Sequence, residues 1–357
     1  LLAEWDLALD SGNDSGLLET HEGTRKEWNT EFTKFYESHY QGWLKTDKRP
    51  TLSPDVTAKY VIPELKVKKK VLYVVVDCMR LDQWMLVEPL LAEFYSVRRN
   101  YYYSILPSAT PFARNALFAG VFPDEIDRLY PDTYKVQDEG SLNRFEDKFL
   151  IDNLARHGVR LEKPPRYVKI YNNTEGEELA KRVADFYDSQ LVTFVFNFLD
   201  ILAHGRSNNV ILKEIAGTEG AFRSLMKSWF VHSPLFAILK AFSRKGFTVV
   251  ITSDHGSVLC RRGTMAHGRK ATSTNLRYKY GDNLNSTPKE SILIKKPEEW
   301  RLPLLTLATT YIVAKEDFYF VYPNNYNEMV RQFQNSFQHG GISLEELVVP
   351  LAVLEPR

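Results

Sequence analysis

The spacing of apolar and polar residues divides the 357-residue chain into two parts. In the first part, large aromatic residues and one histidine recur at steps of three to four positions: Trp28, Phe32, Phe35, His39 and Trp43. This spacing predicts one face of an amphipathic helix. Thr24 followed by Glu27 resembles a capping box, which predicts that the helix begins there.

Residues 1–64 are therefore expected to form a small helical segment and a connector, with Pro50, Pro54 and Pro63 in the connector. Two interpretations of the helix stay open. It could be part of a helical bundle that packs on itself, or it could serve association with a partner or with a second copy of the chain.

From residue 65 to residue 357 the pattern changes to short apolar runs separated by stretches of helical periodicity. The runs cover 71–76, 191–196, 247–251 and 347–354. Continuous β-branched runs are typical of strands buried on both faces, and their alternation with helices predicts an α/β domain with a mostly parallel sheet flanked by helices. Pro350 suggests an edge strand or the start of a strand. Residues 311–321 suggest a hairpin attached to this sheet.

Composition narrows the function classes. Lys and Arg total 46 against 45 Asp and Glu, and the net charge of +1 excludes a strongly basic nucleic-acid coat or an acidic tail. Cys78 and Cys260 are the two cysteines, too few for a disulfide framework, which favours a reducing, cytoplasmic location. No apolar run is long enough for a membrane span. The chain begins without methionine, so we expect a fragment of a longer protein.

Acidic residues follow three of the apolar runs directly or within a few positions. Asp77, Asp200 and Asp254 would meet at the carboxyl edge of the sheet, where they would repel one another unless a cation lay between them. Any one of them alone could instead be an ordinary helix N-cap. His204, four residues after Asp200, and His255, next to Asp254, add imidazole ligands. Oxygen and imidazole together suit Zn²⁺, and Mn²⁺ less well.

Thr110 and Pro111 predict the start of a helix, with Thr110 as the N-cap. One interpretation is a capped helix and nothing more. The other is a nucleophile, because a hydroxyl at a helix N-terminus lies where free N–H groups stabilise a phosphoryl group and a metal can activate it. Arg114, one turn later, could bind phosphate oxygens or could be solvated.

These motifs resemble, in their order along the chain, the alkaline phosphatase superfamily. The narrower likeness is to its PglZ branch and rests on two segments: Ser108-Ala109-Thr110-Pro111 and His339-Gly340-Gly341-Ile342-Ser343-Leu344-Glu345-Glu346. The resemblance covers residues 65–357. The helical segment ahead of it is similar to that of the PorX family of response regulators, which are linked to type IX secretion.

The resemblance implies two Zn²⁺ ions, with Mn²⁺ as the alternative metal. It assigns to the first ion Asp77, Thr110, Asp254 and His255, and to the second Asp200, His204 and His339. His267 competes with His339 for the last position, and we favour His339. His267 would then contact phosphate, together with Arg114, Arg269 and Lys270.

The resemblance also implies a phosphodiesterase that forms a phospho-threonine at Thr110 and hydrolyses cyclic or short linear oligonucleotides. The basic and aromatic stretch 261–280 could bind nucleotides or be a solvated loop. As the output domain of a two-component response regulator, the chain is expected to be a homodimer, with signalling proteins as further candidate partners. The rival interpretation is a non-catalytic, metal-stabilised signalling module that dimerises and binds a protein partner.

Overall fold

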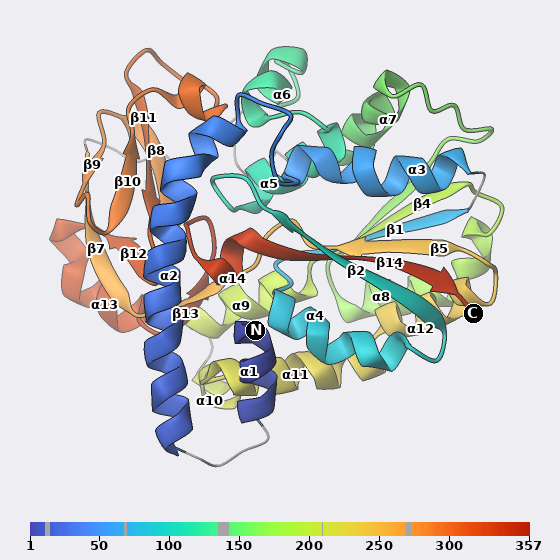
Figure 1. Cartoon of the computed structure of the whole chain (residues 1–357), viewed down its shortest axis with the longest axis horizontal. Helices are drawn as coiled ribbons and strands as arrows, with labels where there is room; N and C mark the ends of the chain where they lie inside the picture. The colour runs from blue at the N-terminus through green and yellow to red at the C-terminus, as the bar shows by residue number, and fades with distance from the viewer. Residues whose placement is uncertain (11–14, 68–69, 135–142, 209, 269–272, 274) are drawn as a thin grey trace.

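Six strands form the central sheet, in the order β2-β14-β5-β1-β4-β3 (Figure 1). Their bounds in the computed structural model are β1 Val71–Val76, β2 Tyr95–Tyr103, β3 Arg166–Ile170, β4 Leu191–Phe196, β5 Thr248–Thr252 and β14 Val348–Pro356. The structure describes residues 1–10, 15–67, 70–134, 143–208, 210–268, 273 and 275–357. Strands β3, β4, β1 and β5 are parallel, which confirms the predicted mostly parallel α/β sheet.

Strand β14 runs antiparallel between β2 and β5, so the expectation of an edge strand at Pro350 is wrong. The proline lies opposite Tyr101 of β2, whereas pairing with β5 begins only at Leu351. Pro350 has no N–H to donate to a neighbouring strand. It lies near the start of β14, as the alternative expectation had it, and precedes the residues that pair with β5.

Helices cover both faces of the sheet because successive residues of its strands point to opposite sides. In β1, Val71, Tyr73 and Val75 join one apolar core, whereas Leu72, Val74 and Val76 join another. The first core is covered by α3 Ile62–Lys66, α5 Thr110–Ala119, α6 Pro123–Leu129 and α7 Glu146–Arg156. The second is covered by α4 Leu81–Val87, α8 Asn173–Lys181, α11 Glu219–His232 and α12 Pro234–Ser243.

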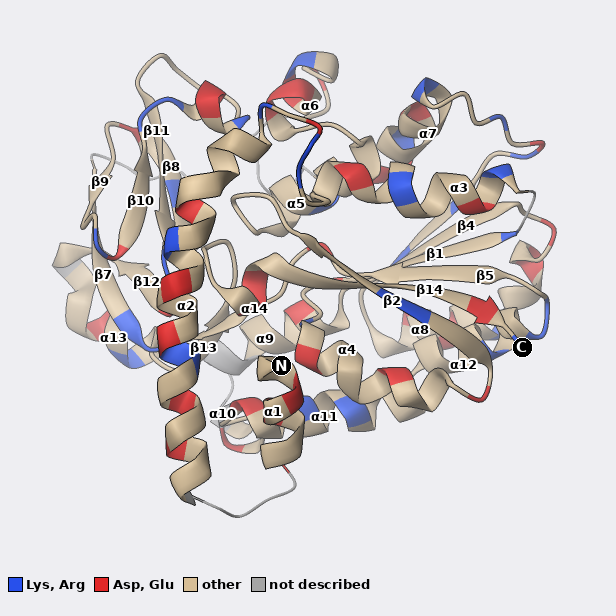
Figure 2. Ribbon diagram, viewed as in Figure 1, with Lys and Arg blue, Asp and Glu red and all other residues tan. Residues whose placement is uncertain are grey.

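Shorter elements complete these layers. Helices α9 Phe198–Asn208 and α10 Val210–Ile215 pack with α11 and Phe337 in a smaller apolar cluster. Helical turns occupy Ser53–Asp55, Thr57–Val61, Glu88–Leu91, Val183–Phe186, Pro297–Trp300 and Pro323–Asn325. Charged residues lie mainly on helices and loops, and β1 and β5 carry few (Figure 2). In the part described, no helix is both long and apolar enough to cross a membrane.

Small sheets gather at one end of the molecule (Figure 1). They contain β6 Val258–Cys260, β7 Arg262–His267, β8 Tyr278–Asp282, β9 Asn285–Ser286, β10 Ser291–Ile294, β11 Thr309–Ala314, β12 Phe318–Val321 and β13 Ser336–Gln338, next to α13 Tyr326–Phe333 and α14 Leu344–Leu347. Strands β11 and β12 belong to different sheets, so the predicted hairpin is absent at these described strands. The end of the basic stretch is buried, since Arg277, Tyr278, Lys279 and Tyr280 lie in the interior. For these four residues both expectations, a nucleotide-binding surface and a solvated loop, are wrong.

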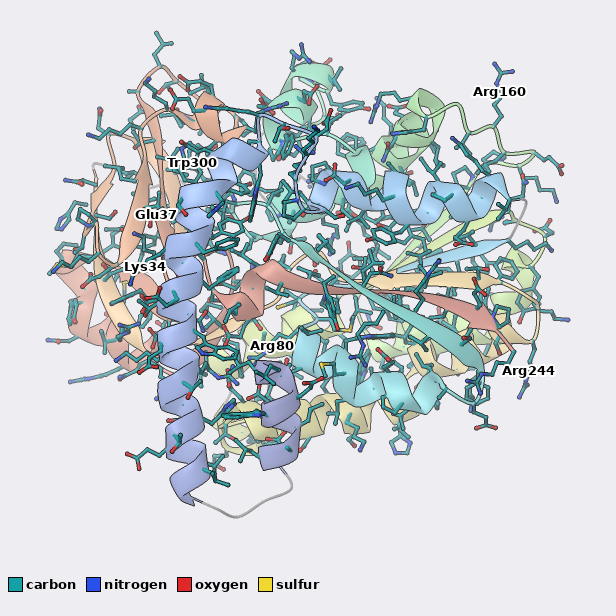
Figure 3. All side chains as sticks on the ribbon, viewed as in Figure 1. Lys34, Glu37, Arg80, Arg160, Arg244 and Trp300 are labelled. Atoms are coloured by element: carbon teal, nitrogen blue, oxygen red, sulfur yellow. The ribbon has the colours of Figure 1, made fainter. Side chains whose placement is uncertain are left out.

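The N-terminal segment forms α1 Leu2–Leu9 and α2 Ser15–Trp43, so α2 begins well before the predicted capping box at Thr24. Its predicted apolar face is also displaced, since Trp28 and Phe35 are 40% and 41% exposed. The buried row contains Asn29, Thr33, Tyr36, Tyr40 and Leu44. Through this row α2 packs on the sheet domain, and Glu37 beside it pairs with Lys315 (Figure 3).

Candidate active site

Two groups of ligand-type side chains lie at the carboxyl ends of β1, β4 and β5. We call Asp77, Asp254 and His255 cluster one, and Asp200, His204 and His339 cluster two. Within each cluster the ligand atoms lie within 4.8 Å of one another. Asp77 directly follows β1, and Asp254 follows β5 by two residues, whereas Asp200 and His204 occupy one face of α9. The strands therefore deliver the predicted carboxylates to a common edge.

Cluster one is oriented by backbone groups. The Nδ1 atom of His255 lies 3.1 Å from the carbonyl oxygen of Gly256, so the tautomer that donates there leaves Nε2 free to accept. That Nε2 lies 3.7 Å from Asp77 Oδ1 and 3.7 Å from Asp254 Oδ2. Asp254 Oδ2 is buried and has no hydrogen-bond partner among the described residues. A buried carboxylate oxygen without a donor is costly, and a cation would satisfy it.

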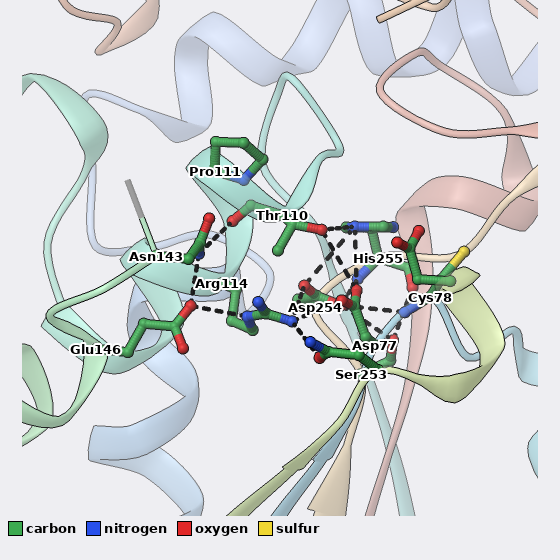
Figure 4. Close-up of polar contacts among 12 residues, drawn as sticks. Asp77, Cys78, Thr110, Pro111, Arg114, Asn143, Glu146, Ser253, Asp254 and His255 are labelled. Carbon is green, nitrogen blue, oxygen red and sulfur yellow. Dashed lines mark hydrogen bonds and ion pairs between the residues drawn. The ribbon is translucent and has the colours of Figure 1, made fainter. Parts of the chain in front are cut away.

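Thr110 is the first residue of α5, because Ala109 occupies the N-cap position. The predicted N-cap assignment is therefore one residue too late. The shift frees the hydroxyl from capping: Thr110 Oγ1 lies 3.0 Å from His255 Nε2 and 3.3 Å from Asp77 Oδ1 (Figure 4). The hydroxyl thus lies beside cluster one, at the N-terminus of α5. Pro111 has no N–H and those of Phe112 and Ala113 donate to Ala109 O, so the N–H that this first turn offers to an anion is that of Thr110.

Arg114 lies beneath this hydroxyl and is buried (Figure 4). Its Nη1 donates to Asp77 Oδ2 at 2.6 Å and to Asn197 Oδ1 at 3.2 Å, and its Nε donates to Glu146 Oε1 at 2.8 Å. The sequence led us to expect phosphate or water as its partners, and in this structure they are two carboxylates and an amide oxygen. Arg114 therefore holds Asp77 in place and offsets part of the charge of cluster one.

Cluster two combines one carboxylate with two imidazoles. Asp200 Oδ1 lies 3.3 Å from His204 Nε2 and 3.3 Å from His339 Nε2, and the two Nε2 atoms are 2.9 Å apart. Although close to these nitrogens, Asp200 Oδ1 makes no hydrogen bond of acceptable geometry. The rings of His339 and His255 stack with centroids 4.2 Å apart, which places the two clusters side by side.

The remaining predicted residues lie elsewhere. His267 is exposed at the end of β7, opposite Asn285 of β9, and is in neither cluster. Arg269 and Lys270 lie outside the described residues. Of the two histidines that compete for the last ligand position, His339 lies in a cluster with Asp200 and His267 does not.

Burial changes the protonation of cluster one. Desolvation and the charge of Asp254 raise the pKa of Asp77 to about 7, although Arg114 opposes the shift. Desolvation also raises the pKa of Asp254 and lowers that of His255. Each shift disfavours the charged form, as expected of ionisable groups packed together without a cation.

In cluster two the shifts have mixed causes. Desolvation would lower the pKa of His204, but the carboxylate of Asp200, 3.3 Å away, raises it overall. Desolvation and the charge of His255 lower the pKa of His339. Burial alone would raise the pKa of Asp200, but its two imidazole partners lower it well below the usual range.

These features fit a divalent cation in each cluster. Each offers three oxygen or nitrogen ligands and a carboxylate oxygen that lacks a hydrogen-bond partner. Three protein ligands of this type with one open position are typical of catalytic zinc sites, whereas structural zinc sites are closed by four.

Three positioning residues escaped the sequence analysis. Glu146 accepts bonds from Arg114, Asn143 and Tyr167, and no local pattern marks it. Asn197 directly follows β4, so its strand-end position could have flagged it. Ser108 donates to Gly341 O at 2.8 Å and accepts from Gly340 N at 3.2 Å, and it stands in the motif that carried the resemblance.

Two family models match the chain. Residues 56–354 match the model of the BREX system PglZ alkaline phosphatase-like domain, and residues 1–44 match that of the PorX response regulator linker domain. No curated protein matches the chain. Among solved structures, it is similar to murine ectonucleotide pyrophosphatase/phosphodiesterase 5, inactive and in complex with AMP, at 12% identity and a TM-score of 0.48 over 80% of this chain and 88% of that one.

Proposed function

Because the chain belongs to the family of PglZ alkaline phosphatase-like domains, we propose that it is a metal-dependent phosphodiesterase with Thr110 as its nucleophile. One observation carries this proposal. The Thr110 hydroxyl lies within 3.3 Å of both Asp77 and His255, at the N-terminus of α5.

In the proposed reaction Thr110 Oγ1 loses its proton to solvent and forms a bond to phosphorus, while the bond from phosphorus to the leaving oxygen breaks and that oxygen takes up a proton from water. Water then cleaves the phospho-threonine. The oxygen of that water bonds to phosphorus as the bond from phosphorus to Thr110 Oγ1 breaks, and Oγ1 regains a proton. Before the reaction the Thr110 hydroxyl donates to Asp77 Oδ1 at 3.3 Å, and the backbone N–H of Thr110 at the N-terminus of α5 would bind a phosphoryl oxygen. Two zinc ions, held by cluster one with Thr110 and by cluster two, would lower the pKa of the hydroxyl and offset the phosphoryl charge.

We propose cyclic or short linear oligonucleotides as substrates. The pairing of Arg114 with Asp77 and Glu146 supports a diester over a monoester. A phosphomonoester carries a second negative charge, which a guanidinium already bonded to two carboxylates offsets poorly. A diester carries one negative charge and makes a smaller demand on the site.

The setting of this activity is also a proposal. The PorX linker match over residues 1–44 supports an output domain of a two-component response regulator. We propose the division between helical segment and catalytic domain at residue 64, whereas the PglZ match begins at residue 56. We further propose a homodimer, a cytoplasmic location and a link to type IX secretion.

The zinc-loaded chain is expected to hydrolyse bis-nitrophenyl phosphate faster than nitrophenyl phosphate. Thr110→Ala should lower diester turnover by at least about 10³-fold, as loss of a nucleophile does in other hydrolases. Thr110→Ser, which keeps a hydroxyl, is the matched control and should retain measurable turnover. Zinc content is measured in all three proteins. Undiminished turnover in Thr110→Ala would overturn the nucleophile, and faster monoester hydrolysis would overturn the diester specificity.

A further inference from the structure

Helix α2 bonds directly to a segment that follows cluster two. Asn29 Nδ2 donates to Glu345 Oε2 at 3.0 Å, and the backbone N–H of Leu344 donates to Asn29 Oδ1 at 2.8 Å. Arg25 Nη1 donates to Glu345 Oε1 at 2.6 Å. Asn29 and Glu345 are both buried, so these bonds are shielded from water. Two turns of α2 thus fix the backbone and the side chain at the start of α14.

The same segment holds the backbone beside His255. The N–H of Gly256 donates to Glu346 O at 3.0 Å, and a Cβ at Gly256 would lie 1.9 Å from Glu345 O. Only glycine permits this close approach. Because the carbonyl of Gly256 accepts from His255 Nδ1, a shift of 345–346 would turn that imidazole.

A parallel connection runs to His339. The carboxylate of Glu346 accepts from Gly341 N at 2.8 Å and pairs with the buried Arg277 at 2.6 Å. Gly341 lies two residues after His339, and its carbonyl accepts from Ser108. The position of α14 therefore sets the loop that carries a ligand of cluster two.

Further along α2, two tyrosines contact the segment that leads to the nucleophile. Tyr36 OH donates to Ser104 O at 2.9 Å, and the N–H of Leu106 donates to Tyr40 OH at 3.0 Å. Ser104 Oγ in turn donates to Asp254 O at 2.8 Å. One buried row of α2 thus reaches the backbone on both sides of the site.

We propose that α2 positions the metal ligands, and that Asn29 and Tyr40 are positioning residues for metal binding and turnover; this inference rests on the proposed metal-dependent function. The contacts reach His255, His339 and the segment before Thr110 through one to three hydrogen bonds each. The Asn29–Glu345 contact also borders a cavity of about 1120 Å³, along which Arg25, His21 and Glu219 lie. On that side Arg25 pairs with Glu219 at 3.3 Å and with Glu345 at 2.6 Å, so polar contacts hold α2 there.

The test compares Asn29→Ala with Thr33→Val. Thr33 is buried in the same row one turn later, but its hydroxyl donates only to the carbonyl of Asn29 within α2, so it is a matched control. Loss of groups that orient metal ligands typically weakens metal affinity or activity by about 10–100-fold. We expect Asn29→Ala to weaken zinc affinity by about 10-fold or more in chelator competition, and to lower kcat without raising KM. Thr33→Val should stay within about twofold of wild type in both.

Hydrogen exchange on the metal-free protein tests, without metal or substrate, whether Asn29 stabilises the loops that carry His255 and His339. The Gly256 and Gly341 amides, both bonded to Glu346, should exchange faster in Asn29→Ala and unchanged in Thr33→Val. Tyr40→Phe removes one acceptor at constant volume and should weaken zinc affinity in the same direction; it decides the matter if Asn29→Ala does not fold. Wild-type affinity and exchange in Asn29→Ala, or equal losses in Thr33→Val, would overturn the proposal. If zinc affinity depends on Asn29 but turnover does not depend on Thr110, the proposed function is overturned. The positioning role of α2 would then still stand.

Discussion

The two clusters offer similar ligands but differ in burial and in charge. Asp254 and His255 of cluster one are fully buried, whereas the side chains of Asp200 and His204 in cluster two are 22% and 43% exposed. Cluster one has two carboxylates and a guanidinium beneath them, and cluster two has one carboxylate and two imidazoles. The difference indicates how each cluster keeps its shape without a cation.

Cluster one is held by elements of the core. Its carboxylates follow β1 and β5, and Arg114 and Glu146 extend the charge pairing into the first apolar core. Cluster two draws its ligands from α9 and from the loop after β13, with two Nε2 atoms that can share only one hydrogen between them. We infer that cluster one is preformed and that cluster two depends more on its cation.

The largest change in stability that tests this difference between the two clusters is expected at Arg114. Arg114→Met keeps much of the side-chain volume but leaves the buried carboxylates Asp77 and Glu146 without their guanidinium. Removing one partner of a buried ion pair typically costs about 3–5 kcal/mol. Urea unfolding of the chelator-treated protein should show a loss of this size in the free energy of unfolding.

His204→Ala is the matched change in cluster two. Because the His204 side chain is partly exposed, the metal-free protein should lose no more than about 1 kcal/mol. Equal losses in the two variants would contradict the view that cluster one alone is built into the folded scaffold.

A smaller effect is expected from pH. The pKa of Asp77 is raised to about 7 in the folded protein, from an ordinary value of 3.8. Between these values the folded state binds a proton that the unfolded state does not, so the stability of the metal-free protein should fall as pH rises. From pH 5.5 to 7 the loss is about 1.6 kcal/mol, at 1.36 kcal/mol per pKa unit and with half of the proton already released at pH 7.

Asp77→Asn should flatten this slope, and saturating zinc should abolish it in the wild type because the metal replaces the proton. In cluster two the pKa of His204 is raised and that of His339 is lowered, so their contributions to the slope oppose each other. If the stability of Asp77→Asn still falls as pH rises, the proton that the folded state binds belongs to another group. Unfolding curves in urea at several pH values, with and without zinc, make the measurement.

The sequence predicted the elements whose pattern is local. The runs at 71–76 and 191–196 are the strands β1 and β4, with bounds matching residue for residue, because a strand buried on both faces is apolar throughout. The position of Asp77 followed from those bounds and from the parallel order. The carboxylates that gather at one sheet edge were therefore predictable from strand ends.

What the sequence did not predict depends on distant contacts. Arg114 was expected to meet phosphate or water, but its partner Glu146 lies 32 residues away and follows no periodicity. The face of α2 was displaced because Asn29 and Tyr40 are buried by bonds to Glu345 and Leu106, whereas the more apolar Trp28 is left partly exposed. Polar groups that are buried by one distant partner carry no signal in a hydrophobic pattern.

The smallest expected effect concerns the histidine that the sequence left as the alternative ligand. His267→Ala should leave zinc stoichiometry and zinc affinity within about twofold of wild type, because His267 is exposed on β7 and shares no cluster with Asp200. His339→Ala removes a buried imidazole of cluster two and should weaken the second zinc by about 10–100-fold or more while the first stays bound. Stepwise chelator titration of the two variants separates the ions. Loss of the second zinc in His267→Ala, with retention in His339→Ala, would move the last ligand to β7. In that case the small sheets would have to close over cluster two for His267 to reach it. The side chains of Asp200 and His204 would then be buried in the metal-loaded protein, and the two clusters would no longer differ in exposure.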